Sequence, residues 1–297
     1  MIKRYVTAFL VLVTFIALCI FGAFHFFGPS LILEPPRTTV SQVFHSPGKA
    51  VFEDIHIRSK DDLLLDGYWM HTTNPTAVVI LVHGIGSHKE QFLNFSRELA
   101  EQGIESVAFD IRAHGRSQGD YVTYGYHEKY DISSIIDYIK SRSPLTKVGV
   151  FGNSLGGAVS LQAMAIDKRI KFGIIESTFA DLEQIVFDYQ RNMTDGYGLQ
   201  SLTNYALHRA GKIADFNPRE VKPMESAKSI DQPVLLIHGS DDKRISLDNA
   251  HMIFNSLATK DKELYVVDGG SHTNLGRAGG LSYHNKIDAF LKRQIME

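Results

Sequence analysis

One junction between a strand pattern and a helix pattern constrains this fold more than any other segment. The β-rich run Lys147–Asn153 leads directly into Ser154, and a helical pattern follows at Ala158–Ile166. So abrupt a turn strains the backbone at the serine and requires small neighbours, here Gly152 and Gly156. In this setting the motif Gly-x-Ser-x-Gly predicts a serine hydroxyl that stands clear of a sheet as a nucleophile, and disfavours an ordinary glycine-rich turn.

From residue 51 onward the chain alternates between strand and helix patterns. The run Ala77–His83 is continuously apolar, which is typical of a strand buried on both faces. This alternation predicts an α/β fold, namely a mostly parallel sheet flanked by helices, in one domain over residues 51–297. The expected strands are 51–58, 63–71, 77–83, 105–110, 147–153, 171–177, 233–238 and 263–268, the first two forming an antiparallel pair.

Residues 180–230 break this rhythm. The interval is about fifty residues of weak helical pattern, which is long for a loop without secondary structure. We therefore expect a short helical cap insertion there.

The N-terminal segment differs from everything after it. Residues 5–27 contain no Asp, Glu, Lys or Arg, and Lys3 and Arg4 precede them. As a helix this stretch is roughly 34 Å long, enough to cross a hydrocarbon core of about 30 Å. A cleavable signal peptide would have a shorter apolar region and small residues at its end, where this chain has bulky aromatic residues. We therefore predict a transmembrane helix and an uncleaved membrane anchor over residues 1–30.

The two basic residues before the apolar stretch predict that the rest of the chain lies on the non-cytoplasmic side of the membrane. Prolines in residues 31–50 predict an extended tether between the anchor and the folded domain. The single cysteine, Cys19, lies inside the apolar stretch, which excludes internal disulfides.

Charge and residue spacing narrow the chemistry. The 297 residues carry a formal net charge of -2 and no basic run, which argues against nucleic acid as a partner. No His, Cys, Asp or Glu set has metal-ligand spacing, and no glycine-rich phosphate loop with its lysine is present. We therefore expect no metal and no cofactor.

A serine hydroxyl needs a base, and in this architecture an acid and then a histidine follow the nucleophile. His272 lies in a small-residue loop after the strand 263–268, where an imidazole can reach the nucleophile. His284 falls in the pattern of the terminal helix and is interpreted as a surface residue. His272 is therefore the predicted base.

The acid has several candidates. Asp241 and Asp242 both follow the strand 233–238, and composition alone leaves the choice between them open. Glu176 and Asp181 follow the strand 171–177 and are alternatives at an earlier strand end.

Five short motifs, each at the end of an expected strand, resemble the α/β-hydrolase superfamily from about residue 78 to the end. The nearest members are serine hydrolases of the monoglyceride-lipase-like and Bem46-like kinds. The motifs are His83-Gly84-Ile85-Gly86, Asp110-Ile111-Arg112-Ala113-His114-Gly115-Arg116-Ser117, Gly152-Asn153-Ser154-Leu155-Gly156-Gly157, His238-Gly239-Ser240-Asp241-Asp242 and Gly270-Ser271-His272. Ile245-Ser246 departs from the Val-Pro that the family often has there.

The resemblance implies Asp242 as the acid, because the family's acid is the fourth residue after the histidine of the His-Gly pair. It also implies the backbone N–H of Ile85 as one donor to the oxyanion. The N–H of Leu155, directly after the nucleophile, is the expected second donor. His83 and His114 are interpreted as residues that shape their loops.

Together these features predict a serine hydrolase that cleaves an ester or related acyl bond through an acyl-enzyme on Ser154. The expected partner is a small-molecule acyl substrate, and the membrane anchor favours lipid esters. A membrane-anchored acyltransferase or a peptidase with the same three residues is the alternative. A non-catalytic binding module is disfavoured, because such modules normally lose one of the three residues.

Overall fold

The computed structural model describes residues 2–39 and 51–296, so part of the predicted tether at 31–50 lies outside the described residues. An eight-stranded sheet forms its centre, with the strand order β1-β2-β4-β3-β5-β6-β7-β8. β2 pairs antiparallel with β1 and β4, and the other pairs are parallel, which confirms the expected mostly parallel sheet. The strands are β1 (Val51–Arg58), β2 (Leu64–His71), β3 (Ala77–Val82), β4 (Ile104–Phe109), β5 (Lys147–Asn153), β6 (Ile170–Glu176), β7 (Val234–Gly239) and β8 (Lys262–Val267).

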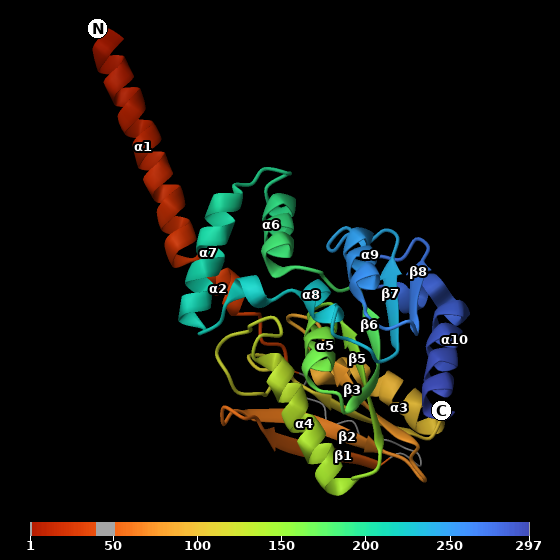
Figure 1. Ribbon diagram of the computed structural model, residues 1–297. Coiled ribbons are helices and arrows are strands. Elements are labelled where there is room, and N and C mark those ends of the chain that lie inside the picture. The colour runs from red at the N-terminus through yellow and green to blue at the C-terminus, as the bar shows by residue number, and fades with distance from the viewer. Residues whose placement is uncertain (1, 40–50, 297) are drawn as a thin grey trace.

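Helices cover both faces of the sheet (Figure 1). Successive side chains of a strand point to opposite faces, so the continuously apolar strand β3 contributes to two cores. Val78, Ile80 and Val82 join the core under one set of helices, and their neighbours Val79 and Leu81 join the other. The first set is α4 (Glu128–Arg142), α5 (Leu155–Ile166), α8 (Pro223–Ala227) and α9 (Leu247–Ser256); the second is α3 (Leu93–Glu101), preceded by the 3-10 helix η1 (Lys89–Phe92), and α10 (Leu275–Met296).

The segment that interrupts the strand pattern is helical. Between β6 and α8 the chain forms α6 (Leu182–Met193), α7 (Gln200–Ile213) and the 3-10 helix η2 (Pro218–Glu220). Asp181 caps α6, since its carboxylate accepts the N–H groups of Glu183 and Gln184. Figure 1 shows α6 and α7 standing as a hairpin away from the sheet, on the side from which α1 (Ile2–Phe26) projects. The boundaries of a separate cap unit remain a prediction.

The N-terminal helix α1 is apolar and exposed except at its C-terminal end, where Phe24 and His25 are partly buried, and it is long enough to cross a membrane. The short helix α2 (Gly28–Leu33) follows it, although an extended segment was expected from residue 31. Ile32 and Leu33 are buried in the core. The hydroxyl of Tyr124 donates to the carbonyl of Ile32 (2.6 Å), and the N–H of Val122 donates to the carbonyl of Leu33 (2.9 Å). Burial of these two apolar side chains explains why the start of the segment is ordered.

Candidate active site

The turn between β5 and α5 has the strained backbone that the glycine pattern predicts. Ser154 has φ 55° and ψ -119°, a conformation that residues with a side chain rarely adopt. Its N–H donates to the carbonyl of Glu176 at the end of β6 (2.8 Å). A Cβ atom at Gly156 would collide with the backbone of Val82, and one at Gly152 with the carbonyl of Gly156. Glycine at position 156 lets the turn lie against the end of β3, and glycine at position 152 lets β5 lie against the start of α5.

The hydroxyl of Ser154 lies next to an imidazole from a distant part of the chain. The Oγ of Ser154 is 3.0 Å from Nε2 of His272, although 118 positions separate the two residues. The Nδ1 of His272 is 2.7 Å from Oδ2 of Asp242, whose side chain is completely buried. Since a carboxylate only accepts hydrogen bonds, Nδ1 carries the proton and Nε2 is free to accept the serine proton.

The carboxylate of Asp242 is held in its charged form. Burial opposes the charge, but hydrogen bonds from His272 and from the backbone N–H groups of Ile245 and Arg244 lower the pKa of Asp242 below its usual value. The two N–H groups donate to Oδ1 at 3.0 and 2.9 Å. One oxygen of Asp242, Oδ2, therefore faces the imidazole, while the other, Oδ1, is bound by the loop.

The other candidate acids lie elsewhere. Asp241 is exposed at the surface, and its backbone N–H donates to the carbonyl of Gly270 (2.8 Å). Asp181 caps α6 and forms an ion pair with Lys222 (3.0 Å). The buried carboxyl of Glu176 accepts a hydrogen bond from the hydroxyl of Tyr283 in α10. His284 is exposed on α10, as expected.

The loop after β3, which carries the predicted oxyanion donor Ile85, lies beside the turn of Ser154. A Cβ atom on Gly84 would lie 3.3 Å from Cβ of Ser154, so this loop packs directly against the nucleophile turn. Among the described residues, no acceptor is present for the backbone N–H of Ile85 or that of Leu155. Both N–H groups therefore remain unused, and their role as donors to a developing oxyanion stays a prediction.

His83 and His114 are fully buried and bind backbone groups of the loops that carry them. The Nε2 of His83 accepts the N–H of Ile111 (3.0 Å), while its Nδ1 donates to the carbonyl of Gly84 (2.7 Å). The Nδ1 of His114 donates to the carbonyl of Arg112 (3.0 Å). Burial lowers the pKa of His83 to about 3, so this ring is neutral at physiological pH. These hydrogen bonds agree with the interpretation that His83 and His114 shape their loops.

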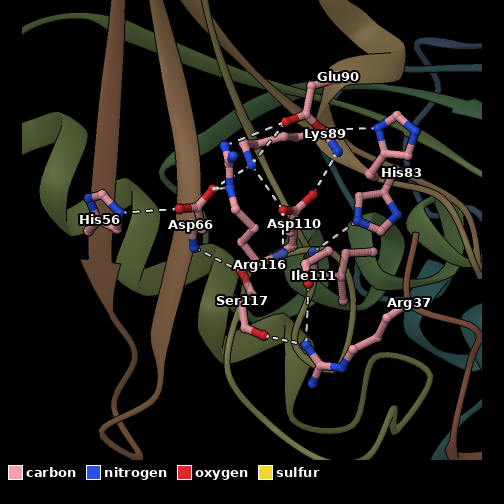
Figure 2. Close-up of polar contacts among 12 residues, drawn as sticks. Arg37, His56, Asp66, His83, Lys89, Glu90, Asp110, Ile111, Arg116 and Ser117 are labelled. Atoms are coloured by element: carbon pink, nitrogen blue, oxygen red, sulfur yellow. Dashed lines mark hydrogen bonds and ion pairs between the residues drawn. The ribbon is translucent and has the colours of Figure 1, made fainter. Parts of the chain in front are cut away.

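A buried lysine behind the Ile85 loop escaped the sequence analysis (Figure 2). The ammonium of Lys89 is 1% exposed and contacts Asp110 (3.0 Å), Asp66 and Glu90 (3.3 Å). Asp110 also accepts the backbone N–H of Lys89 (2.8 Å) and that of Arg116 (2.9 Å). This network ties the loop after β3 to the loop after β4. A single lysine in a helical pattern is normally exposed, so the sequence contains no signal for it.

The described residues contain no cluster of His, Cys, Asp or Glu that could hold a metal ion. The fold, with a strained serine at the end of its fifth strand and a histidine beside it, is that of an α/β-hydrolase.

Comparisons with known proteins agree with this class. A family model described as serine aminopeptidase, S33, matches residues 73–192. The Escherichia coli protein YfhR is 25% identical over 86% of this chain and 88% of its own. Mouse monoglyceride lipase is 22% identical over 76% of this chain and 86% of its own. The structure of the Pyrococcus furiosus esterase Pf2001 has a TM-score of 0.70 and 25% identity, covering 88% of this chain and 99% of its own.

The chain is therefore a serine hydrolase of the α/β-hydrolase superfamily, an enzyme that resembles esterases and lipases.

Proposed function

We propose that this enzyme hydrolyses a carboxylic ester through an acyl-enzyme on Ser154. The observation that carries the proposal is the continuous chain of contacts from the serine hydroxyl through His272 to Asp242, at 3.0 and 2.7 Å. Similarity to an esterase and to monoglyceride lipases favours an ester over other acyl bonds.

The reaction follows from the roles of these atoms. Nε2 of His272 takes the proton of Ser154 as Oγ attacks the substrate carbonyl, and the N–H groups of Ile85 and Leu155 bind the oxyanion. The imidazolium then protonates the leaving alcohol, which departs and leaves an acyl ester on Ser154. Water, deprotonated by the same imidazole, attacks that ester and releases the acid. Asp242 keeps the imidazole in the required tautomer and stabilises its charged form.

The apolar helix α1 supports a membrane location for this chemistry. We propose that residues 5–27 cross the membrane, with the catalytic domain on the non-cytoplasmic side, and that the substrate is a small acyl compound such as a lipid ester. The similarity to a serine aminopeptidase family makes a peptidase the second candidate, and an acyltransferase would use the same acyl-enzyme.

A fluorophosphonate probe tests the nucleophile, because it reacts only with an activated serine. The full-length enzyme in detergent should be labelled, and Ser154→Ala should remain unlabelled while keeping its melting temperature. Labelling of the alanine variant would contradict the proposal.

Substrate panels then separate the candidate reactions. We expect turnover of p-nitrophenyl esters and none of amino-acid p-nitroanilides. Preferential turnover of the anilides would establish a peptidase. Transfer of the acyl group to added glycerol in preference to water would establish an acyltransferase.

A further inference from the structure

The helix that we propose to cross the membrane is attached to the α6–α7 hairpin. The hydroxyl of Tyr205 in α7 is 2.6 Å from Nδ1 of His25, and the ring of Phe21 lies against that of Tyr205 with 5.2 Å between centroids. One turn further along α7, the guanidinium of Arg209 donates to the carbonyl of His25 (3.1 Å). The hairpin is thus held beside the end of α1 by three contacts.

This attachment determines the level of the hairpin's tip relative to the bilayer. In Figure 1, α1 and α7 both start on the side away from the sheet and run toward it. Each helical residue rises about 1.5 Å, so Leu199 at the start of α7 lies about 9 Å farther from the sheet than Tyr205. The tip of the hairpin, residues 193–199, therefore reaches the level of the apolar part of α1.

The composition of the tip suits a membrane interface. Met193, Tyr197 and Leu199 are 79%, 80% and 62% exposed. Residues 196–207 contain no Asp, Glu, Lys, Arg or His, and the next charged residue is Arg209. Single exposed apolar side chains are common on soluble proteins, but three within seven residues of one loop are unusual. Tyrosine beside aliphatic residues is typical of the headgroup region of a bilayer.

Charged residues limit the depth of the tip, because Asp195 lies within it and Arg191 lies at its base. Arg191 and Asp195 flank Met193 and are exposed. Burial of either charge in hydrocarbon would be costly, so the tip can lie in the headgroup region but not deep in the bilayer.

We propose that the tip of the α6–α7 hairpin is a second membrane contact, inserted into the interface of the bilayer that α1 crosses. The proposal rests on the membrane-spanning role proposed above for α1. The same hairpin reaches the loop of the catalytic acid, because the side-chain amide of Asn192 donates to the carbonyl of Lys243 (3.4 Å). A bilayer contact at the tip would thus fix the position of the active site relative to the membrane surface.

Single cysteines labelled with the environment-sensitive fluorophore NBD test this contact in the full-length protein. In a Cys19→Ser background, Tyr197→Cys and Leu199→Cys are labelled and the protein is reconstituted into phosphatidylcholine vesicles. We expect a blue-shifted emission and loss of emission when the acyl chains of the lipid carry bromine. Leu145→Cys is the matched control. Leu145 is 99% exposed and precedes β5, so it lies at the amino end of the parallel strands, away from the hairpin.

The outcomes separate failure of this contact from failure of the anchor. The native Cys19 reports on α1 itself, and loss of its NBD emission on brominated lipid shows that α1 is in the bilayer. If Cys19 is quenched while positions 197 and 199 behave like position 145, the tip contact is overturned and the anchor stands. Blue-shifted emission at the tip without quenching by lipid would also overturn it, because the tip would then be covered by protein, such as a second copy of the chain.

Discussion

At the residue scale, two adjacent aspartates have opposite environments. Asp242 is buried and bound by an imidazole and two backbone N–H groups, whereas Asp241 is exposed. Asp242→Asn would keep the shape of the side chain but favour the wrong imidazole tautomer. We expect kcat to fall about 10⁴-fold.

Asp241→Asn is the matched control, since it makes the same chemical change one position earlier. We expect its kcat on p-nitrophenyl esters to equal that of the wild type. Equal losses in the two variants would contradict the assignment of the acid.

The buried carboxyl of Glu176 makes stability depend on pH. Burial raises the pKa of Glu176 from 4.5 to about 7, although the hydroxyl of Tyr283 partly offsets this effect. The folded state therefore binds a proton more tightly than the unfolded state. This difference in proton affinity contributes about 3 kcal/mol to the free energy of unfolding. The contribution is fully present below pH 4.5 and is lost as the pH rises through about 7.

We accordingly expect the Tm of the full-length protein in detergent to fall between pH 5 and pH 8, and the fall to be smaller in Glu176→Gln. The glutamine retains an acceptor for Tyr283 but cannot titrate. Glu101→Gln, at an exposed position of α3, should follow the wild-type curve. A Glu176→Gln variant with an unchanged pH dependence would refute the raised pKa.

At the scale of elements, the loops after β3 and β4 are joined through one ammonium group. Burial opposes the charge of Lys89, but contacts with Asp66 and Asp110 raise its pKa, so the group stays charged. Lys89→Met would leave two buried or partly buried carboxylates without their main partner. Breaking a buried pair in this way costs about 3 kcal/mol, which corresponds to a Tm lower by about 10 °C.

The loop of Ile85 should also lose its position, and we therefore expect a lower kcat in Lys89→Met at temperatures where the variant is folded. Lys60→Met, at an exposed position after β1, serves as the control and should change neither quantity. A Lys89→Met variant with wild-type Tm and kcat would show that the network does not support the loop.

At the scale of the whole molecule, α1 projects from the folded domain (Figure 1). No residue of α1 is buried. If α1 crosses a bilayer, the full-length protein should remain in the membrane pellet after carbonate extraction. In Leu12→Arg/Ile16→Arg, each arginine near the middle of the span opposes insertion by about 2.5–3.5 kcal/mol, and the protein should move to the supernatant.

Leu281→Arg is the control for this experiment, because Leu281 is 81% exposed on α10, outside the proposed span. It should stay in the pellet. A wild-type protein found in the supernatant and shortened at its N-terminus would show that α1 is a cleaved signal sequence.

Local pattern alone predicted much of this molecule. The eight strands, the glycine-lined turn at Ser154 and the apolar N-terminal helix follow from periodicity and backbone strain within a few neighbouring residues. These properties are local, so a single stretch of sequence contains them.

Contacts between distant segments were decided by the tertiary structure. Parallel strands bring their carboxyl ends to one edge, and only the strand order determines which loops meet there. The burial of Lys89, the pairing of Glu176 with Tyr283 and the attachment of His25 to Tyr205 all depend on such meetings. No local pattern encodes them, because the partner in each contact comes from a distant segment of the chain.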